Sequence, residues 1–282
     1  MRSEVDRLAV VLANQVQVTG AATITTANGG GLDVGPLANG RLTSTGQLDL
    51  RGVQGQVRLI NGGQINGSPI LVNSTYTINV GGVITTTDQL NQAVATVNTM
   101  PTIVGSTYEI LVGANLVLSQ TIVANRPMTL RGTSAAITLN GSATATTGMS
   151  IGAGGSGSRV TSLAFSGFTG TGIQLSNAQN VAVSGVTVNY SGYGLSVAGT
   201  STGSTVRGST FNFCPNAIVL SSATGVTIGG TAAGQPNRIN SSARAGVFAT
   251  GFCTGSSVIK TSFSNTPVRY NTTSSRNLRV VQ

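Results

Sequence analysis

The sequence predicts an all-β protein whose C-terminal part is a parallel β-helix. The main observation is a repeat, because the stretches "VTSLAFSGFTGTGIQL", "VSGVTVNYSGYGLSV" and "VRGSTFNFCPNAIVL" begin at Val160, Val183 and Val206, 23 residues apart. Within each stretch apolar and polar residues alternate, as in a strand with one buried face. Gly, Asn and Ser separate the alternating stretches, which is typical of turns. A leucine-rich repeat is excluded, because no regular pattern of Leu followed by a helix is present.

Units of this size cannot bury an apolar face alone, so they must stack. We therefore predict coils wound around an inner column of Val, Ile, Leu and Phe. Aligning the units by residue type matches Phe168 with Tyr190 and Phe213, which predicts equivalent positions for these three aromatic side chains. Irregular units continue the pattern beyond residue 220, one of them carrying the insertion "GGTAAGQPN".

The chain before the repeats is predicted to hold a short helix over residues 1–17 and a β-rich stem or attachment region over 18–82. Ser3 can cap the helix, and Glu4 and Asp6 would lie in its first turn, where the helix dipole favours acids. Its apolar residues are spaced by 4, 3 and 4, as in a coiled-coil seam, which predicts self-association or packing on the protein's own domain. The seam consists of Val5, Ala9, Leu12 and Val16.

The 18–82 region has short alternating stretches broken by glycine, and the sequence leaves open whether it is a small β-domain, an intertwined stem or a continuation of the solenoid. A second helix is predicted at about 87–98, with Thr86 or Thr87 as its cap and Pro101 beyond its end. We predict that this helix caps the open first coil of a β-helix domain spanning 83–282, because it would cover an unpaired edge.

Charge is unevenly distributed along the chain. All six acids precede residue 110, and the rest of the chain has nine arginines, Lys260 and no acid. These cations must be solvated, bonded to carbonyl groups or available to an anionic partner. Nucleic acid is not expected as the partner, since the cations are scattered and aromatics are few. The residues predicted to meet anionic host-surface polysaccharide are Arg207, Arg238, Arg244 and Lys260.

No metal or cofactor site is predicted. The sequence has no histidine, and Cys214 and Cys253 lack metal-site spacing. The two cysteines are predicted to be small buried residues, with a disulfide as the alternative. No stretch approaches the roughly 20 apolar residues of a membrane span. The N-terminus lacks the pattern of a secretory signal, so export by that route is not expected.

The segment "DQLNQAVATVNTM", followed by "YEILVGANLVLSQTIVANRPMTLRG", resembles the start of the pectate-lyase-like right-handed β-helix superfamily, over about residues 83–280. The resemblance implies a right-handed parallel β-helix. The superfamily contains polysaccharide lyases, hydrolases, bacterial surface proteins and bacteriophage tailspikes. Its hydrolases use paired carboxylates, and its lyases use calcium held by carboxylates with Arg or Lys as base. Residues 110–282 contain no carboxylate side chain, so we predict a non-catalytic member with no catalytic residues.

These observations favour a structural virion protein of a bacteriophage, either a tail fibre, a spike or a capsid-attached fibre. We expect a homotrimer that contacts other virion proteins through its N-terminal region and presents the β-helix to host-surface glycans. One alternative is a bacterial cell-surface or extracellular adhesin or matrix solenoid. A polysaccharide lyase or hydrolase is a further alternative, which rests on fold analogy alone.

Overall fold

The protein is an all-β solenoid of parallel strands. The computed structural model describes residues 10–12, 15–20, 22–25, 31–34, 40–54, 56–60, 63–67, 70–72, 78–101, 103–104 and 107–282. Contacts divide the chain into two units, Met1–Leu111 and Val112–Gln282. Strand β12 (Tyr108–Val112) spans this division.

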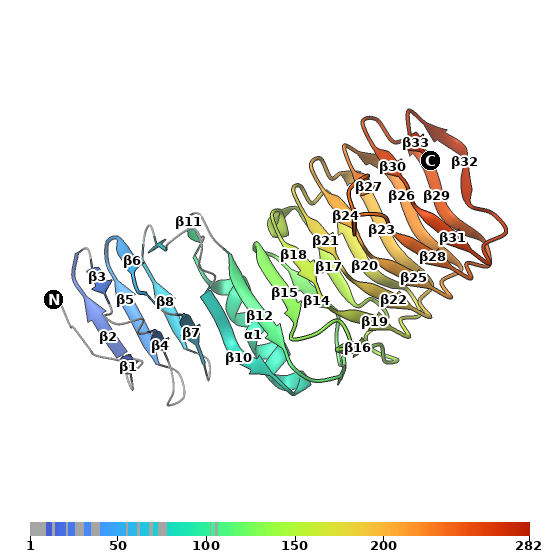
Figure 1. The fold of residues 1–282 in the computed structure, drawn as a ribbon. Helices are drawn as coiled ribbons and strands as arrows, with labels where there is room; N and C mark the ends of the chain where they lie inside the picture. Colours follow the sequence, from blue (N-terminus) through green and yellow to red (C-terminus); the bar gives the residue numbers. More distant parts are fainter. Residues whose placement is uncertain are drawn as a thin grey trace. The chain divides into compact units, whose positions relative to one another are not determined.

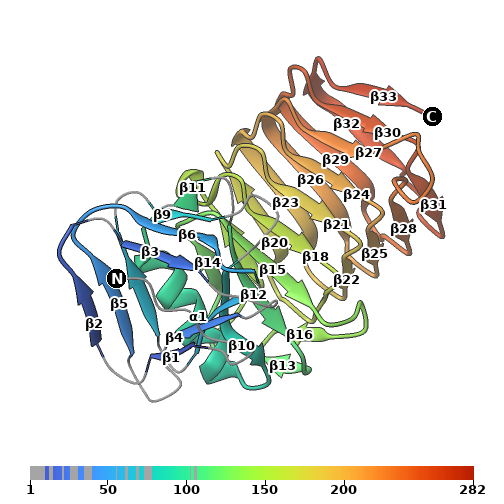
Figure 2. The same cartoon turned by 60° about the vertical axis from the view of Figure 1, so that its left-hand side comes forward.

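The C-terminal unit has three faces, and each complete coil contributes one strand to each face (Figures 1 and 2). The first face contains β15 (Met128–Gly132), β18 (Arg159–Thr161), β21 (Ala182–Ser184), β24 (Thr205–Arg207), β27 (Thr227–Gly229), β30 (Ser257–Ile259) and β33 (Arg279–Val281). The second contains β13 (Leu116–Val117), β16 (Thr138–Asn140), β19 (Ala164–Ser166), β22 (Thr187–Asn189), β25 (Thr210–Asn212), β28 (Arg238–Asn240) and β31 (Ser262–Ser264). The third contains β14 (Ile122–Ala124), β17 (Met149–Ile151), β20 (Thr171–Ser176), β23 (Tyr193–Thr200), β26 (Asn216–Thr224), β29 (Ala245–Phe252) and β32 (Tyr270–Arg276).

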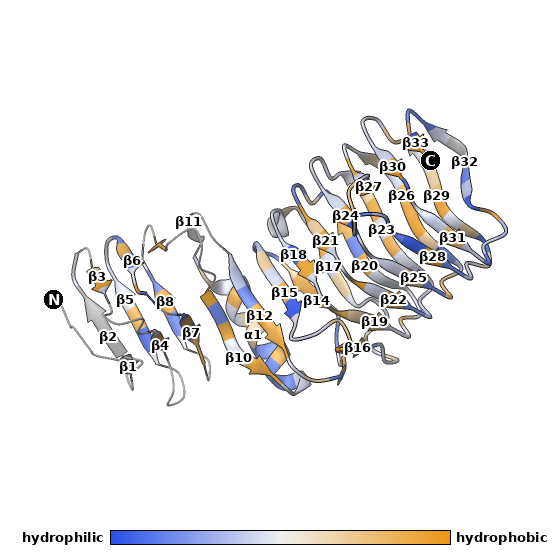
Figure 3. Ribbon diagram, in the orientation of Figure 1, coloured by the Kyte–Doolittle hydropathy of each residue, from blue (hydrophilic) through white to orange (hydrophobic). Residues whose placement is uncertain are grey.

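Equivalent residues of successive coils stack into a buried apolar column, which confirms the predicted 23-residue repeat. Val160 pairs with Val183, and Val183 with Val206, all at most 1% exposed. Figure 3 shows that apolar segments recur on the strands from one coil to the next. Burial of such side chains stabilises each coil by about 1.5–3 kcal/mol per residue.

One part of the predicted alignment is wrong. Phe168 is fully buried and packs on Phe165, with ring centroids 6.2 Å apart, whereas Tyr190 and Phe213 are exposed. Backbone hydrogen bonds from Gly167 N to Asn189 O and from Tyr190 N to Asn212 O make Gly167, not Phe168, the equivalent of Tyr190. A strict spacing of 23 carries Phe168 to residue 191, so the error came from matching aromatic residues by type.

Each coil turns at its corners through residues with positive φ. The first corner joins the first and second faces, and the second corner joins the second and third faces. At the second corner the positive-φ residues are Gly167 (75°), Tyr190 (49°), Phe213 (55°), Ser241 (56°) and Asn265 (47°). Glycine adopts this conformation without a steric penalty, whereas a residue with a Cβ is destabilised by about 1–2 kcal/mol of conformational energy.

Buried serines satisfy backbone groups where the third face of one coil leads to the first face of the next. Ser204 Oγ accepts a hydrogen bond from Val181 N at 3.1 Å and donates one to Ala178 O at 2.9 Å. Ser256 repeats the arrangement with Val226 N and Ala223 O. The turns therefore remain closed to water without leaving these polar groups unpaired, which would cost about 1–3 kcal/mol each.

The N-terminal unit is also built from parallel coils. Its three sheets contain β1 (Val10–Leu12), β4 (Leu32–Val34), β7 (Val57–Leu59) and β10 (Ile78–Ile84); β2 (Gln15–Val18), β5 (Arg41–Ser44) and β8 (Gln64–Asn66); and β3 (Ala22–Thr25), β6 (Leu48–Gly52), β9 (Ile70–Leu71) and β11 (Ile103–Val104). The described strands of the 18–82 region therefore form parallel coils, and the sheet that contains β4, β7 and β10 continues in order with β12 and β15. Arg58 of β7 forms an ion pair with Asp33 of β4 on the neighbouring coil.

The predicted N-terminal helix is wrong wherever the structure describes it. Leu12 lies in β1 and Val16 lies in β2, so these two residues cannot share a helical seam. Valines at alternate positions of "QVQV" favour a strand, and pairing with Arg41–Ser44 supplies a partner that the heptad spacing did not reveal. Val5 and Ala9 lie outside the described residues.

Helix α1 (Thr87–Thr99) confirms the helix predicted at about 87–98. Of the two predicted caps, Thr86 is the one observed, and it forms a capping box in which Thr86 Oγ1 accepts from Gln89 N and the Gln89 side chain accepts from Thr86 N. In the described part of the chain, no helix is long and apolar enough to cross a membrane.

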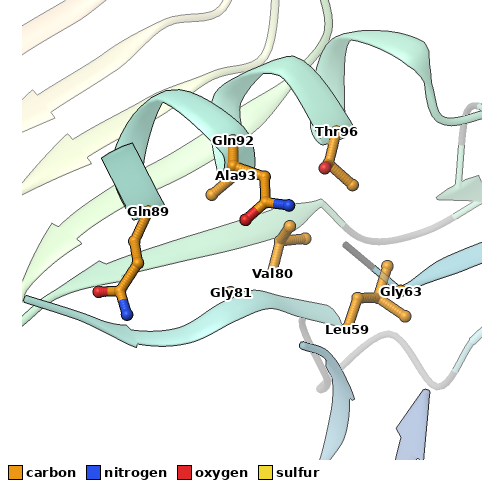
Figure 4. Close-up of a pocket in the computed structure, with 8 residues that line it drawn as sticks. All are labelled: Leu59, Gly63, Val80, Gly81, Gln89, Gln92, Ala93 and Thr96. Carbon is orange, nitrogen blue, oxygen red and sulfur yellow. The ribbon is translucent and has the colours of Figure 1, made fainter. Parts of the chain in front are cut away.

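Helix α1 belongs to the N-terminal unit rather than to the predicted domain spanning 83–282. Coils precede it in the chain, so it does not cap a first coil. It packs on β10, and Leu90 and Val97 are fully buried. Figure 4 shows side chains of the helix facing β10 and Leu59 of β7. These residues line a small cavity of about 40 Å³.

Replacing an inward aromatic residue should cost far more stability than replacing an outward one two positions away. Phe211→Ala should lower the free energy of unfolding by about 3–5 kcal/mol, because it empties part of the inner column. Phe213→Ala should change it by less than about 1.5 kcal/mol, because only a surface ring contact is lost. Urea unfolding followed by circular dichroism measures both, and equal losses would contradict the burial of Phe211 and the exposure of Phe213 at the corner.

Candidate functional site

The structure distributes the four predicted cationic residues over two corners. Arg207 ends β24, Arg238 begins β28 and Lys260 follows β30, so these three lie along the first corner in successive coils. Arg244 lies instead at the second corner, where its backbone N donates to Pro215 O at 2.8 Å. The first corner therefore gathers three cations, and the fourth belongs to a different surface.

The insertion at 229–237 forms part of the first corner. Asn237 is fully buried, and its side chain accepts from Ser209 N and donates to Val206 O, both at 2.9 Å. These bonds hold the inserted loop against the coil that carries Arg207. The Nε atom of Arg207 is buried without a hydrogen-bond partner among the described residues.

The four cationic residues have no carboxylate partner in their own unit. Residues 112–282 contain no Asp or Glu, and the ion pairs Arg51–Asp49 and Arg58–Asp33 both lie in the N-terminal unit. The three cations of the first corner make the electrostatic potential there positive, and this potential attracts a polyanion.

A second group of side chains was missed by the sequence analysis. At the second corner the rings of Tyr190 and Phe213 stack at 4.8 Å with an angle of 4° between their planes. They remain 63% and 50% exposed. The repeated "VNY" and "FNF" at 188–190 and 211–213 could have revealed this pair, had they been aligned at the 23-residue spacing.

A ladder of asparagine amides borders these rings. Asn240 Nδ2 donates to Asn212 Oδ1 at 2.7 Å, and Asn212 Nδ2 donates to Asn189 Oδ1 at 2.8 Å. The three amides lie one coil apart at the ends of β22, β25 and β28. We call Asn189, Asn212, Asn240, Tyr190 and Phe213 the asparagine–aromatic ridge.

The two cysteines are free and buried, as the sequence predicted, and the alternative of a disulfide is not realised. Cys214 lies at the second corner, and Cys253 follows β29 at the turn toward the first face. Burial raises the pKa of the Cys214 thiol to about 11 and raises the pKa of Cys253 as well. Both thiols are therefore poor nucleophiles at neutral pH.

The other cavities and side-chain clusters of the described residues have fewer groups that could bind a ligand. In the N-terminal unit, a cavity of about 280 Å³ lies between β5, β8 and the end of α1, and Arg41 is the charged residue that lines it. The described residues contain no group of three or more His, Cys, Asp or Glu side chains placed to hold a metal ion.

Comparison of the chain with protein-family models, with curated proteins and with solved structures gives no match. The parallel solenoid is therefore established by the structure of this chain, and its resemblance to the pectate-lyase-like superfamily stays a prediction. Any functional conclusion must come from the two corners themselves.

The raised pKa of Cys214 predicts a loss of stability at alkaline pH. Because the folded protein holds this proton more tightly than the unfolded chain, its contribution is complete below the ordinary pKa of 9.0 and is lost as the pH rises to about 11. Unfolding in urea at several pH values should therefore show a steeper alkaline loss for the natural protein than for Cys214→Ala. Identical slopes would contradict the burial of this thiol.

Proposed function

We propose that this chain is a structural protein of a bacteriophage virion, in the form of a tail fibre, a spike or a capsid-attached fibre, that attaches to anionic glycans of the host surface. The observation that carries the proposal is a parallel solenoid whose C-terminal unit has ten cationic side chains and no carboxylate side chain. Three of these cations follow the first corner through successive coils, which suits a partner with repeated negative charges.

The solenoid architecture supports a role in attachment. Hydrogen bonds join each coil to the next, so side chains at one corner are held at fixed intervals on a stiff surface. A polymer with a regular repeat can contact several coils at once, and the many weak contacts then add in one binding event. The same surface would serve a bacterial adhesin. Detection of the chain in purified virions would support the virion protein, and detection in bacterial cell envelopes would support the adhesin.

Cleavage of the glycan is not part of the proposal. Polysaccharide hydrolases and lyases of the kinds considered above depend on carboxylates that act on the sugar or hold calcium. Residues 112–282 contain none. Release of reducing ends or of unsaturated sugars during incubation with a bound polysaccharide would overturn this part of the proposal.

The proposal includes assembly as a homotrimer whose N-terminal unit contacts other virion proteins. A helical seam cannot supply the trimer contact through Leu12 and Val16, since both lie in strands. Light scattering of the full chain should give three times the chain mass of 28.3 kDa. A monomer over the concentration range of the experiment would contradict the trimer and leave glycan binding to be tested separately.

Glycan binding should depend on the first-corner cations and on salt. We expect the full chain to bind acidic polysaccharides on a printed array of bacterial surface polysaccharides. Changing Arg207, Arg238 and Lys260 together to Gln should weaken this binding about tenfold, and raising NaCl from about 50 mM to about 500 mM should weaken it further by screening.

The matched control changes Arg159, Arg276 and Arg279 together to Gln, which removes three exposed cations where the third face leads to the first, away from this corner. Equal effects of the control and the first-corner variant would show that total charge, rather than the first corner, determines binding. Absence of binding to every polysaccharide would overturn the proposed function.

A further inference from the structure

We infer that the asparagine–aromatic ridge at the second corner is a carbohydrate-binding site, in which a pyranose ring stacks on Tyr190 and contacts the neighbouring amides. This inference deepens the proposed function and rests on it, since it names a site that holds the glycan by ring stacking and hydrogen bonds rather than by charge. The site is separate from the first-corner cations.

The backbone gives no reason for aromatic residues at these positions. Tyr190 and Phe213 have φ values of 49° and 55°, in the left-handed region that large side chains disfavour. The equivalent residue of the preceding coil is Gly167, which meets the same requirement without a side chain. The rings are therefore retained against the local backbone preference, which is the kind of outlier that points to function.

Packing of the core gives no reason either. The inner column at this level is filled by Phe211 and Cys214, both at most 1% exposed. The two rings cover one face of each other and leave more than half of Tyr190 open to solvent. Exposed aromatic surface bordered by polar groups is typical of a binding site.

Open space lies at the position of Gly167, on the side of Tyr190 away from Phe213. The ring of Phe213 covers one face of Tyr190, and the preceding coil presents Gly167 at the equivalent position. A Cβ placed on Gly167 would have no atom within 4 Å. A flat ring can therefore enter the space that a side chain at residue 167 would fill. The C–H groups on one face of a pyranose carry partial positive charge and suit the negative face of an aromatic ring.

The amide ladder supplies hydrogen bonds of the kind that sugar hydroxyls require. Asn212 uses one N–H and one lone pair in the ladder, which leaves its amide a second donor and a second acceptor position. Ser166, at the equivalent position to Asn189, adds a hydroxyl one coil away. A sugar hydroxyl both donates and accepts, so such a row can contact successive sugars of a chain that runs from coil to coil.

Other classes of ligand fit the ridge less well. A stable protein–protein interface needs roughly 1,000 Å² or more of buried surface, whereas the ridge offers two rings bordered by amides. Single-stranded nucleic acid stacks on aromatic rings but also needs a basic groove beside them. Arg207, Arg238 and Lys260 lie at the other corner, so only Arg244 of the four cations is at the same corner. That arginine favours a sugar with an acidic substituent.

The test compares the full chain with two variants on the printed polysaccharide array. Tyr190→Ala combined with Phe213→Ala removes the stacking surface. Gly167→Asn leaves both rings in place and puts a side chain into the open space beside Tyr190. Asparagine is chosen because it tolerates positive φ. We expect each variant to lose at least about tenfold in affinity, which corresponds to about 1.4 kcal/mol. The loss should persist at high salt, where charge contacts are screened.

The matched control is Phe252→Ala, since Phe252 is also an exposed aromatic of the C-terminal unit, 59% exposed and in contact with Arg276. It should bind as the natural protein does, and circular dichroism verifies that every variant is folded. If the natural protein binds glycans and both ridge variants bind them equally well, the ridge inference is overturned while the proposed function stands. If the natural protein binds no glycan, both are overturned.

Discussion

The organising constraint of this protein is parallel main-chain pairing that keeps each coil in register with the next. Once Val160, Val183 and Val206 are paired, all the remaining positions of these coils are also placed above their equivalents. A side chain that is inward in one coil is inward in the next, and the apolar column follows. The same pairing produces the asparagine ladder and the stacked rings on the outside, since an amide or ring meets its copy one coil away. Core and surface are therefore consequences of one register.

Much of the fold could be predicted from the sequence, and the failures have physical causes. The coils from residue 160 onward were predictable because turn residues and apolar residues return at a fixed interval. The helix at Thr87–Thr99 was predictable from its capping box and apolar face. The strands β1 and β2 were mistaken for a helix, because short stretches of Val and Leu fit both periods and only distant partners decide between them. The coils of the 18–82 region could not be assigned, since their irregular turns conceal the repeat.

The candidate sites were harder to predict than the fold. The unbalanced charge is visible in the sequence, but which cations share a corner depends on how many residues each turn contains. Arg244 is close in sequence to Arg238, yet one strand carries the chain from the first corner to the second between them. The ridge was missed because aligning Phe168 with Tyr190 assigned an inward side chain to an outward position. A displacement of one residue reverses inside and outside in a strand, so a small alignment error concealed the main surface feature.

The absence of acidic and histidine side chains from residues 112–282 has a consequence for how this unit responds to its surroundings. Asp, Glu and His are the side chains whose ordinary pKa lies between about 3 and 8, and this unit has none of them. Burial raises the pKa of both of its thiols. The side-chain charge of the unit is therefore nearly constant from about pH 4 to about pH 9. In acidic or mildly alkaline water, ionisation of the partner alone would change the Coulombic attraction between them. Such a surface behaves as a fixed-charge material, comparable to a strong anion-exchange resin.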